Sequence, residues 1–116
     1  MSDFSTLKSL ISTLDQVTEE PHFDKTSFRI KKKIFATYNP AFNRTCVKLS
    51  QIDQEVFVKV GKGAIYPVDN KWGKQGWTLI DLNTVEHDLL KDALETAYCE
   101  VAPLKLADAL KAKYNL

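Results

Sequence analysis

The sequence predicts an α+β domain of two layers, in which one antiparallel sheet is covered on one face by helices. Apolar residues recur at helical spacing near both ends of the chain. Between them lie short segments rich in β-branched and aromatic residues, separated by breaks of hairpin length. Hairpin-linked strands with helices outside them favour an antiparallel sheet. The expected order is α-β3-α-β2-α with a C-terminal helical tail, and the second sheet face is left open to solvent.

The first helix is predicted over residues 3–15. Ser2 can cap this helix, and Asp3 suits the positive end of its dipole. Residues 17–24, which contain Pro21, are expected to form a loop. The apolar residues of the helix follow the spacing of one helix face and are Phe4, Leu7, Leu10, Ile11 and Leu14.

Three consecutive antiparallel strands are expected next, over residues 26–30, 34–38 and 45–49. Each is rich in β-branched or aromatic residues. Lys31-Lys32-Lys33 would form the tip of the first hairpin, and Asn39-Pro40 marks the turn before the third strand.

A second helix is predicted over residues 51–59, because Ser50-Gln-Ile-Asp53 resembles a capping box. Residues 56–60 would also suit a strand, so the helix has a competing interpretation. Gly61-Lys62-Gly63 follows the helix, whereas a phosphate-binding loop precedes one. A left-handed helix cap at Gly61 is therefore the better explanation of these glycines.

The second half of the chain should contain two more strands and the longest helix. Thr84 can cap that helix and Pro103 ends it. In chain order we expect an extended piece, a polar loop, a strand, the long helix and a helical tail over residues 64–68, 69–76, 77–82, 86–101 and 104–113. The inward face of the long helix is expected to be Leu90, Ala93, Leu94, Ala97 and Val101.

Length and composition indicate a single domain over residues 1–116. Hydrophobic residues make up 44% of the chain and charged residues 27%, which is ordinary for one globular core. The apolar runs are far shorter than the roughly 20 residues of a membrane span. The chain starts with acidic and polar residues rather than a basic segment before an apolar one, which argues against a secretory signal. We expect a cytoplasmic monomer without membrane association.

Catalytic and metal-binding patterns are missing from the sequence. His22 and His87 form no HxxxH or HExxH pair, and a metal site needs three or four convergent ligands. Cys46 and Cys99 lie 53 positions apart and form no CxxC pair, so we expect two unpaired thiols. The expectation is a binding protein that is not an enzyme and uses no metal or cofactor.

Several short motifs follow one another in the order of a known family. They are Leu14-Asp-Gln-Val17-Thr18-Glu19, His22-Phe23, Phe28-Arg-Ile30, Lys33-Ile-Phe35-Ala36, Cys46-Val47-Lys48-Leu49, Tyr66-Pro67, Lys74-Gln-Gly76-Trp77 and Ala97-Tyr98. With these motifs the chain resembles the MmcQ/YjbR-like family of small bacterial proteins over residues 7–103. The resemblance implies the two-layer α-β3-α-β2-α fold of secretion-chaperone-like and frataxin-like domains. It also implies DNA binding and carries over no catalytic residue. Many members have His-Trp where this chain has Gly76-Trp77, so any role of that histidine is absent here.

Charge is unevenly distributed along the chain. Residues 25–74 hold eleven Lys/Arg against three Asp/Glu, whereas all remaining residues hold five against twelve. Such asymmetry indicates a surface that faces a polyanion. The alternative is that the charges keep a bare sheet face soluble.

The strand pattern places these basic residues. Alternation puts Arg29, Lys31 and Lys48 on the sheet face opposite the core. The hairpin tip and the polar loop add further lysines, and Trp72 in that loop can stack a base or cover the sheet edge. The predicted nucleic-acid-binding residues are Arg29, Lys31, Lys32, Lys33, Lys48, Lys71, Trp72 and Lys74.

Two other functions remain open on the sequence. One is a protein-interaction or chaperone-like module with Trp72 and Tyr66 as anchors. The other is a small-ligand-binding protein with a site near Tyr66, Trp72 and Lys74.

Overall fold

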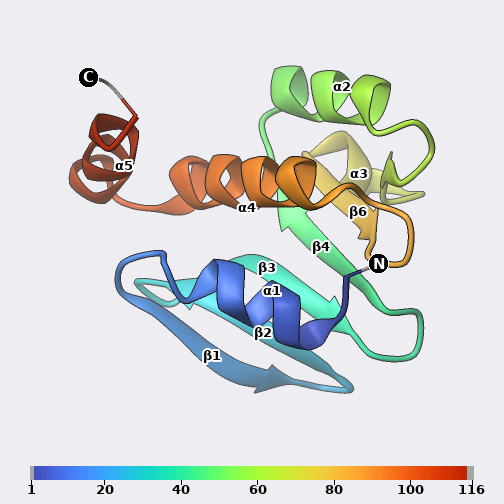
Figure 1. Cartoon of the computed structure of the whole chain (residues 1–116), viewed down its shortest axis with the longest axis horizontal. Coiled ribbons are helices and arrows are strands. Elements are labelled where there is room, and N and C mark those ends of the chain that lie inside the picture. The colour runs from blue at the N-terminus through green and yellow to red at the C-terminus, as the bar shows by residue number, and fades with distance from the viewer. Residues whose placement is uncertain (1, 115–116) are drawn as a thin grey trace.

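A computed structural model describes residues 2–114 and shows a six-stranded sheet covered by helices (Figure 1). The strands are β1 (Val17–His22), β2 (Lys25–Ile30), β3 (Lys33–Asn39), β4 (Arg44–Lys48), β5 (Ile65–Pro67) and β6 (Trp77–Asp81). The helices are α1 (Phe4–Ile11), α2 (Gln51–Val60), α3 (Lys71–Lys74), α4 (His87–Val101) and α5 (Leu104–Ala112). The strand order is β1-β2-β3-β4-β6-β5, and every neighbouring pair is antiparallel.

The helices lie mainly on one face of the sheet. Figure 1 shows α1 and α4 on the same side of the strands, and α4 packs on β3 and β4. The helix α2 packs beside β5, α3 contacts β6, and α5 packs on α4. The predicted α+β class and the three consecutive antiparallel strands over residues 25–49 are confirmed.

The core forms because inward-facing residues of neighbouring strands stand in register. Phe28, Ala36, Val47 and Thr78 pair across β2, β3, β4 and β6 in one row, and all four are buried. The helices cover this row with apolar side chains of their own, as strand alternation and helix periodicity require.

The register shifts by one residue at Phe35. Arg29 pairs with Ile34 and Phe28 pairs with Ala36, so Phe35 is left without a partner on β2. Its side chain is fully buried and meets the ring of Tyr98 edge-on, with 5.9 Å between the ring centroids. The β-bulge therefore supplies an additional core residue beneath α4.

The structure corrects the prediction of a loop over residues 17–24, because β1 lies there as an outermost strand. Proline is tolerated on such strands, so Pro21 does not break it. Residues 18–21 are all exposed, and for that reason the segment shows no alternation of buried and exposed positions. The expected order of three strands before the second helix becomes four.

Several predicted helix ends also differ. The first helix stops at Ile11, and its N-cap is Asp3 rather than Ser2. A short helix, α3, lies inside the predicted polar loop. The long helix begins after Glu86, and the Thr84 hydroxyl donates to the Asp81 carboxylate instead of capping the helix.

The prediction of a left-handed cap at Gly61 is wrong. Its φ is −75°, and the left-handed positions are Lys62 and Gly63. Gly61 is needed for space instead, because a Cβ atom there would lie 2.8 Å from the side chain of Ile65. The second helix itself is confirmed, with the Ser50 hydroxyl accepting from the Asp53 backbone N–H at 3.1 Å.

Candidate binding site on the open face of the sheet

The face opposite the helices carries a hollow of about 530 Å³. Strand register places Thr37, Cys46 and Leu79 side by side across β3, β4 and β6. Ile34 and Trp77 extend this floor. The floor is therefore mostly apolar and half-buried.

Aromatic and positively charged side chains line the rim. Phe23, from the turn between β1 and β2, is 95% exposed, and Trp72 of α3 is 49% exposed. Lys25 and Arg44 supply two positive charges. The Lys25 ammonium lies 3.1 Å from the Asp24 carboxylate, which partly neutralises it. No carboxylate lines the hollow within residues 2–114, so it combines aromatic surface with positive charge.

Arg44 has no carboxylate partner among the residues that the structure describes. One terminal guanidinium nitrogen donates to the Tyr66 hydroxyl at 3.4 Å, and the guanidinium lies 4.5 Å from the centroid of the Phe42 ring. The Nε atom is buried without a hydrogen-bond partner. Asp81 pairs with Arg44 in the ladder, but its carboxylate accepts from the residues of the following turn.

Cys46 contributes an uncharged side chain to the floor of the hollow. Burial raises the pKa of its thiol to about 11, although the nearby positive charges of Arg44 and Lys25 act in the opposite direction. The thiol therefore stays protonated at neutral pH and is a poor nucleophile. Cys46 and Cys99 are both free thiols in the structure.

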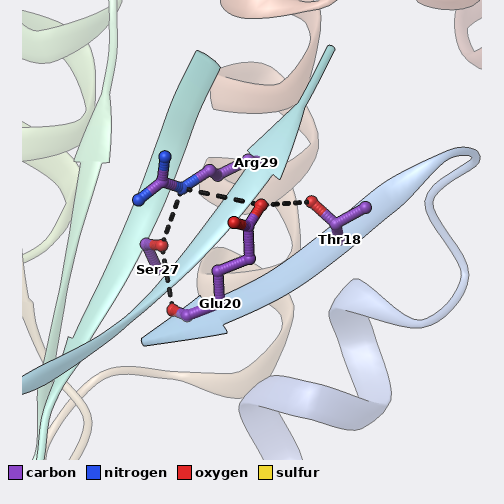
Figure 2. Close-up of polar contacts among 4 residues, drawn as sticks. All are labelled: Thr18, Glu20, Ser27 and Arg29. Atoms are coloured by element: carbon purple, nitrogen blue, oxygen red, sulfur yellow. Dashed lines mark hydrogen bonds and ion pairs between the residues drawn. The ribbon is translucent and has the colours of Figure 1, made fainter. Parts of the chain in front are cut away.

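Arg29 lies on the open face as predicted, but it is held by neighbours on β1 and β2 (Figure 2). Its Nε donates to the Ser27 hydroxyl at 3.0 Å and lies 3.9 Å from a Glu20 carboxylate oxygen. The Thr18 hydroxyl donates to the same carboxylate oxygen. Figure 2 shows the terminal guanidinium nitrogens turned away from β1. Glu20 partly neutralises Arg29, so Arg29 is a weaker candidate for anion binding than Arg44.

Lys48 also faces away from the core, yet its ammonium group is hydrogen-bonded within the protein. Its ammonium group donates to the backbone carbonyl of Gln75 at 2.6 Å and to that of Leu49 at 3.3 Å. These bonds hold the C-terminal end of α3 against β4. Lys48 therefore positions the elements around the hollow more than it offers a charge to a ligand.

The predicted placement of Lys31 on the open face is wrong. Lys31 and Lys32 form the two-residue turn between β2 and β3, with φ angles of 50° and 71°. Lys33 pairs with Ile30, whose side chain points into the core, so Lys33 belongs to the helix side of the sheet. All three lysines are exposed at one end of the molecule.

The loop residues divide between two surfaces. Trp72 lines the hollow, and the ammonium of Lys71 lies 5.4 Å from the centroid of its ring. Lys74 lies on the other side of α3, in a depression with Asp69 and Lys71. The small-ligand site near Tyr66, Trp72 and Lys74 stays a prediction. Within residues 2–114, Trp72 and Lys74 line different cavities, and the Tyr66 hydroxyl accepts from Arg44 at the rim of the hollow.

Sequence reasoning missed Arg44, Lys25 and Trp77 as site residues. The third strand was expected to start at Thr45, one residue late, which left Arg44 in the turn. Extending the strand by one residue places Arg44 on the same face as Cys46 and Lys48.

Gln54 supports the aromatic side of the hollow from beneath. It is 9% exposed, and its side-chain amide donates to the Gly73 carbonyl at 2.9 Å, the Trp77 carbonyl at 3.2 Å and the Thr78 hydroxyl at 3.0 Å. This single amide joins α2 to the elements that carry Trp72 and Trp77.

Gln54→Met should lower the free energy of unfolding by about 1–3 kcal/mol, because it keeps side-chain bulk but leaves buried carbonyls without a donor. Urea denaturation followed by circular dichroism measures the loss. Gln51→Met is the matched control, since Gln51 is exposed and donates only to the Lys74 carbonyl. Its effect should stay within about 0.5 kcal/mol. Equal losses in both variants would contradict the role of Gln54.

These features define a small two-layer α+β protein with a concave site on its bare sheet face, lined by aromatic rings and positive charges. A family model described as YjbR matches residues 12–100, and the chain belongs to the YjbR family. This confirms the resemblance found in the sequence. The matched residues include all six strands of the sheet.

A solved structure shows the same fold. It is the crystal structure of Deinococcus radiodurans protein DR2400, described as a DUF419 domain, with a TM-score of 0.74 and 21% sequence identity. The match covers 86% of this chain and 78% of that chain. No curated protein matches the chain.

Within residues 2–114, no group of three or more His, Cys, Asp or Glu side chains is arranged to hold a metal ion. In the same part of the chain no helix is long and apolar enough to cross a membrane.

Proposed function

We propose that this protein binds nucleic acid through the open face of its sheet, largely without sequence preference. The observation that carries the proposal is the hollow, in which exposed aromatic rings and positive charges occur together and no carboxylate of residues 2–114 belongs to the lining. Aromatic rings stack on bases of any sequence, and positive side chains release counterions from phosphates. The chemistry of the hollow matches these two requirements.

The positive charge around the hollow extends beyond its rim. Lys71 lies beside Trp72, and Lys31 and Lys32 project from the hairpin tip. Arg29 adds a partly neutralised charge next to Ile34. None of these side chains lies on a helix suited to the major groove. Affinity should therefore come from the backbone and from stacking, with little reading of base edges.

A salt titration tests the proposal. The affinity for a fluorescein-labelled oligonucleotide is measured by anisotropy. We expect this affinity to fall steeply as the salt concentration rises from about 50 to about 200 mM. The double variant Lys25→Gln/Arg44→Gln should reduce the slope of log affinity against log salt by about 1.4–1.8, as expected for two lost phosphate contacts.

The matched control is Lys91→Gln/Lys105→Gln, which removes the same charge from exposed positions on α4 and α5. Its slope should equal that of the unmodified protein. Circular dichroism establishes that both variants are folded. No binding at low salt, or equal slopes in the two double variants, would refute this interface.

A second function, protein interaction, is favoured by one separate observation. Ile52, Val56 and Val60 lie at successive turns of α2 and are 77%, 54% and 50% exposed. An apolar stripe of this kind is typical of a contact surface for another protein. If no nucleic acid binds at low salt, this surface becomes the first to test by substitution of Val56 with Lys.

A further inference from the structure

The two ends of the hollow differ in chemistry. Lys25 begins β2 and Arg44 begins β4, and these strands run in the same direction because each is antiparallel to β3. Both cations therefore lie at one end of the sheet. Trp77 begins β6, which runs the other way, and pairs with Lys48 at the opposite end.

Trp72 belongs to the Trp77 end. It lies on α3, and the Lys48 ammonium binds the carbonyl of Gln75 just after that helix. Arg44 and Lys48 lie four positions apart on β4, which corresponds to about 13 Å along the strand. The hollow thus has its two tryptophans at one end. Its two cations, with Phe23 beside Lys25, lie at the other end. A short oligonucleotide can span the distance between the two ends.

A double helix and a single strand present their bases differently to such a hollow. Bases of a duplex are stacked and paired inside it, whereas an unpaired base can turn outward onto an aromatic ring. The volume of about 530 Å³ falls within the roughly 300–1,000 Å³ of small-ligand sites. A recess of this size with two tryptophans suits a single base and its sugar.

From this arrangement we propose that the hollow receives an unpaired base of a single-stranded nucleic acid. The base stacks against Trp72 and Trp77, and a phosphate of a neighbouring nucleotide binds Arg44. Lys25 adds a weaker positive charge beside that phosphate, because Asp24 partly neutralises it. Arg44 suits this role because no carboxylate within residues 2–114 pairs with it. The inference rests on the proposed nucleic-acid binding and adds to it a preference for single strands over duplexes.

Intrinsic fluorescence tests this inference directly, because the chain contains two tryptophans and both line the hollow. The probes are a single-stranded deoxythymidine oligomer and a duplex of the same length, at one salt concentration. The single strand should quench the fluorescence and bind at least about tenfold more tightly than the duplex, since only its bases can stack on the protein. Inorganic phosphate should leave the fluorescence unchanged.

Trp72→Ala should weaken single-strand binding by about 5- to 150-fold, which is the measured range for loss of one stacked base. Trp72→Phe, which keeps an aromatic ring, should restore most of the affinity. Because Trp72 is half-exposed, both variants should fold, and circular dichroism establishes that they do. The duplex affinity should not change in either variant.

The possible outcomes separate this inference from the function on which it rests. Equal binding of single strand and duplex, with Trp72→Ala unchanged, would overturn the base site and leave nucleic-acid binding in place. Binding of neither probe at low salt would overturn both. Single-strand preference lost in Trp72→Ala and regained in Trp72→Phe is the result that supports the base site.

Discussion

Gly76→Ala is expected to lower the free energy of unfolding by about 3–5 kcal/mol. Gly76 has a φ of 103°, which disfavours any side chain, and its carbonyl accepts from the Leu49 backbone N–H at 2.9 Å. A Cβ atom here would overlap the Leu49 carbonyl oxygen and lie 3.1 Å from the Lys48 ammonium. The substitution therefore combines backbone strain with a clash between β4 and β6. Chemical denaturation followed by circular dichroism measures the effect.

Gly63→Ala separates the two causes. Gly63 also has a positive φ, of 92°, but nothing lies within 4 Å of a Cβ atom added there. It should cost only about 1–2 kcal/mol, the price of a left-handed backbone. If Gly63→Ala destabilises the protein as much as Gly76→Ala, the close approach of Leu49 is not the cause. Gly76→Ala should also weaken binding in the hollow, because Trp77 follows it directly.

Phe35→Ala is expected to destabilise the protein by about 3–5 kcal/mol. The side chain is fully buried at the β-bulge and packs edge-on against Tyr98, so truncation leaves a cavity beneath α4. The neighbouring strands cannot close that cavity without losing their register. A urea titration gives the loss in stability.

Phe23→Ala provides the comparison for this prediction, because Phe23 is 95% exposed. Its removal should change the free energy of unfolding by no more than about 0.5 kcal/mol. A small effect of Phe35→Ala, close to that of Phe23→Ala, would mean that the bulge residue does not contribute to the core.

Much of this fold could be predicted because local patterns agree with tertiary packing. Alternation in β2, β3 and β4 matches their buried rows, and the capping residue Ser50 lies where the second helix begins. The strand β1 could not be found in this way. Its residues 18–21 are exposed and therefore show no alternation of buried and exposed positions. The segment is a strand because it pairs with β2, and its local sequence pattern does not reveal that pairing.

The candidate site was less predictable than the fold. Alternation placed Arg29 and Lys48 on the correct face. It could not show that the Arg29 guanidinium is paired with Glu20, or that the Lys48 ammonium donates to the Gln75 carbonyl. Those partners lie 9 and 27 residues away along the chain. The hollow itself depends on the order of strands in the sheet, which brings Trp77 beside β4. The spacing of residues in the sequence does not reveal that β6 pairs with β4.

Both outermost strands of the sheet contain a proline, Pro21 in β1 and Pro67 in β5. A peptide that joins a sheet as an extra strand needs a row of free backbone donors and acceptors, and proline lacks the N–H donor. β5 is also only three residues long, and β1 carries the exposed carboxylates of Glu19 and Glu20. Growth of the sheet by main-chain pairing is therefore disfavoured at either margin. If the protein binds nucleic acid as proposed, neighbouring copies on one strand would not join into a common sheet, and recognition would depend on side chains of the sheet face.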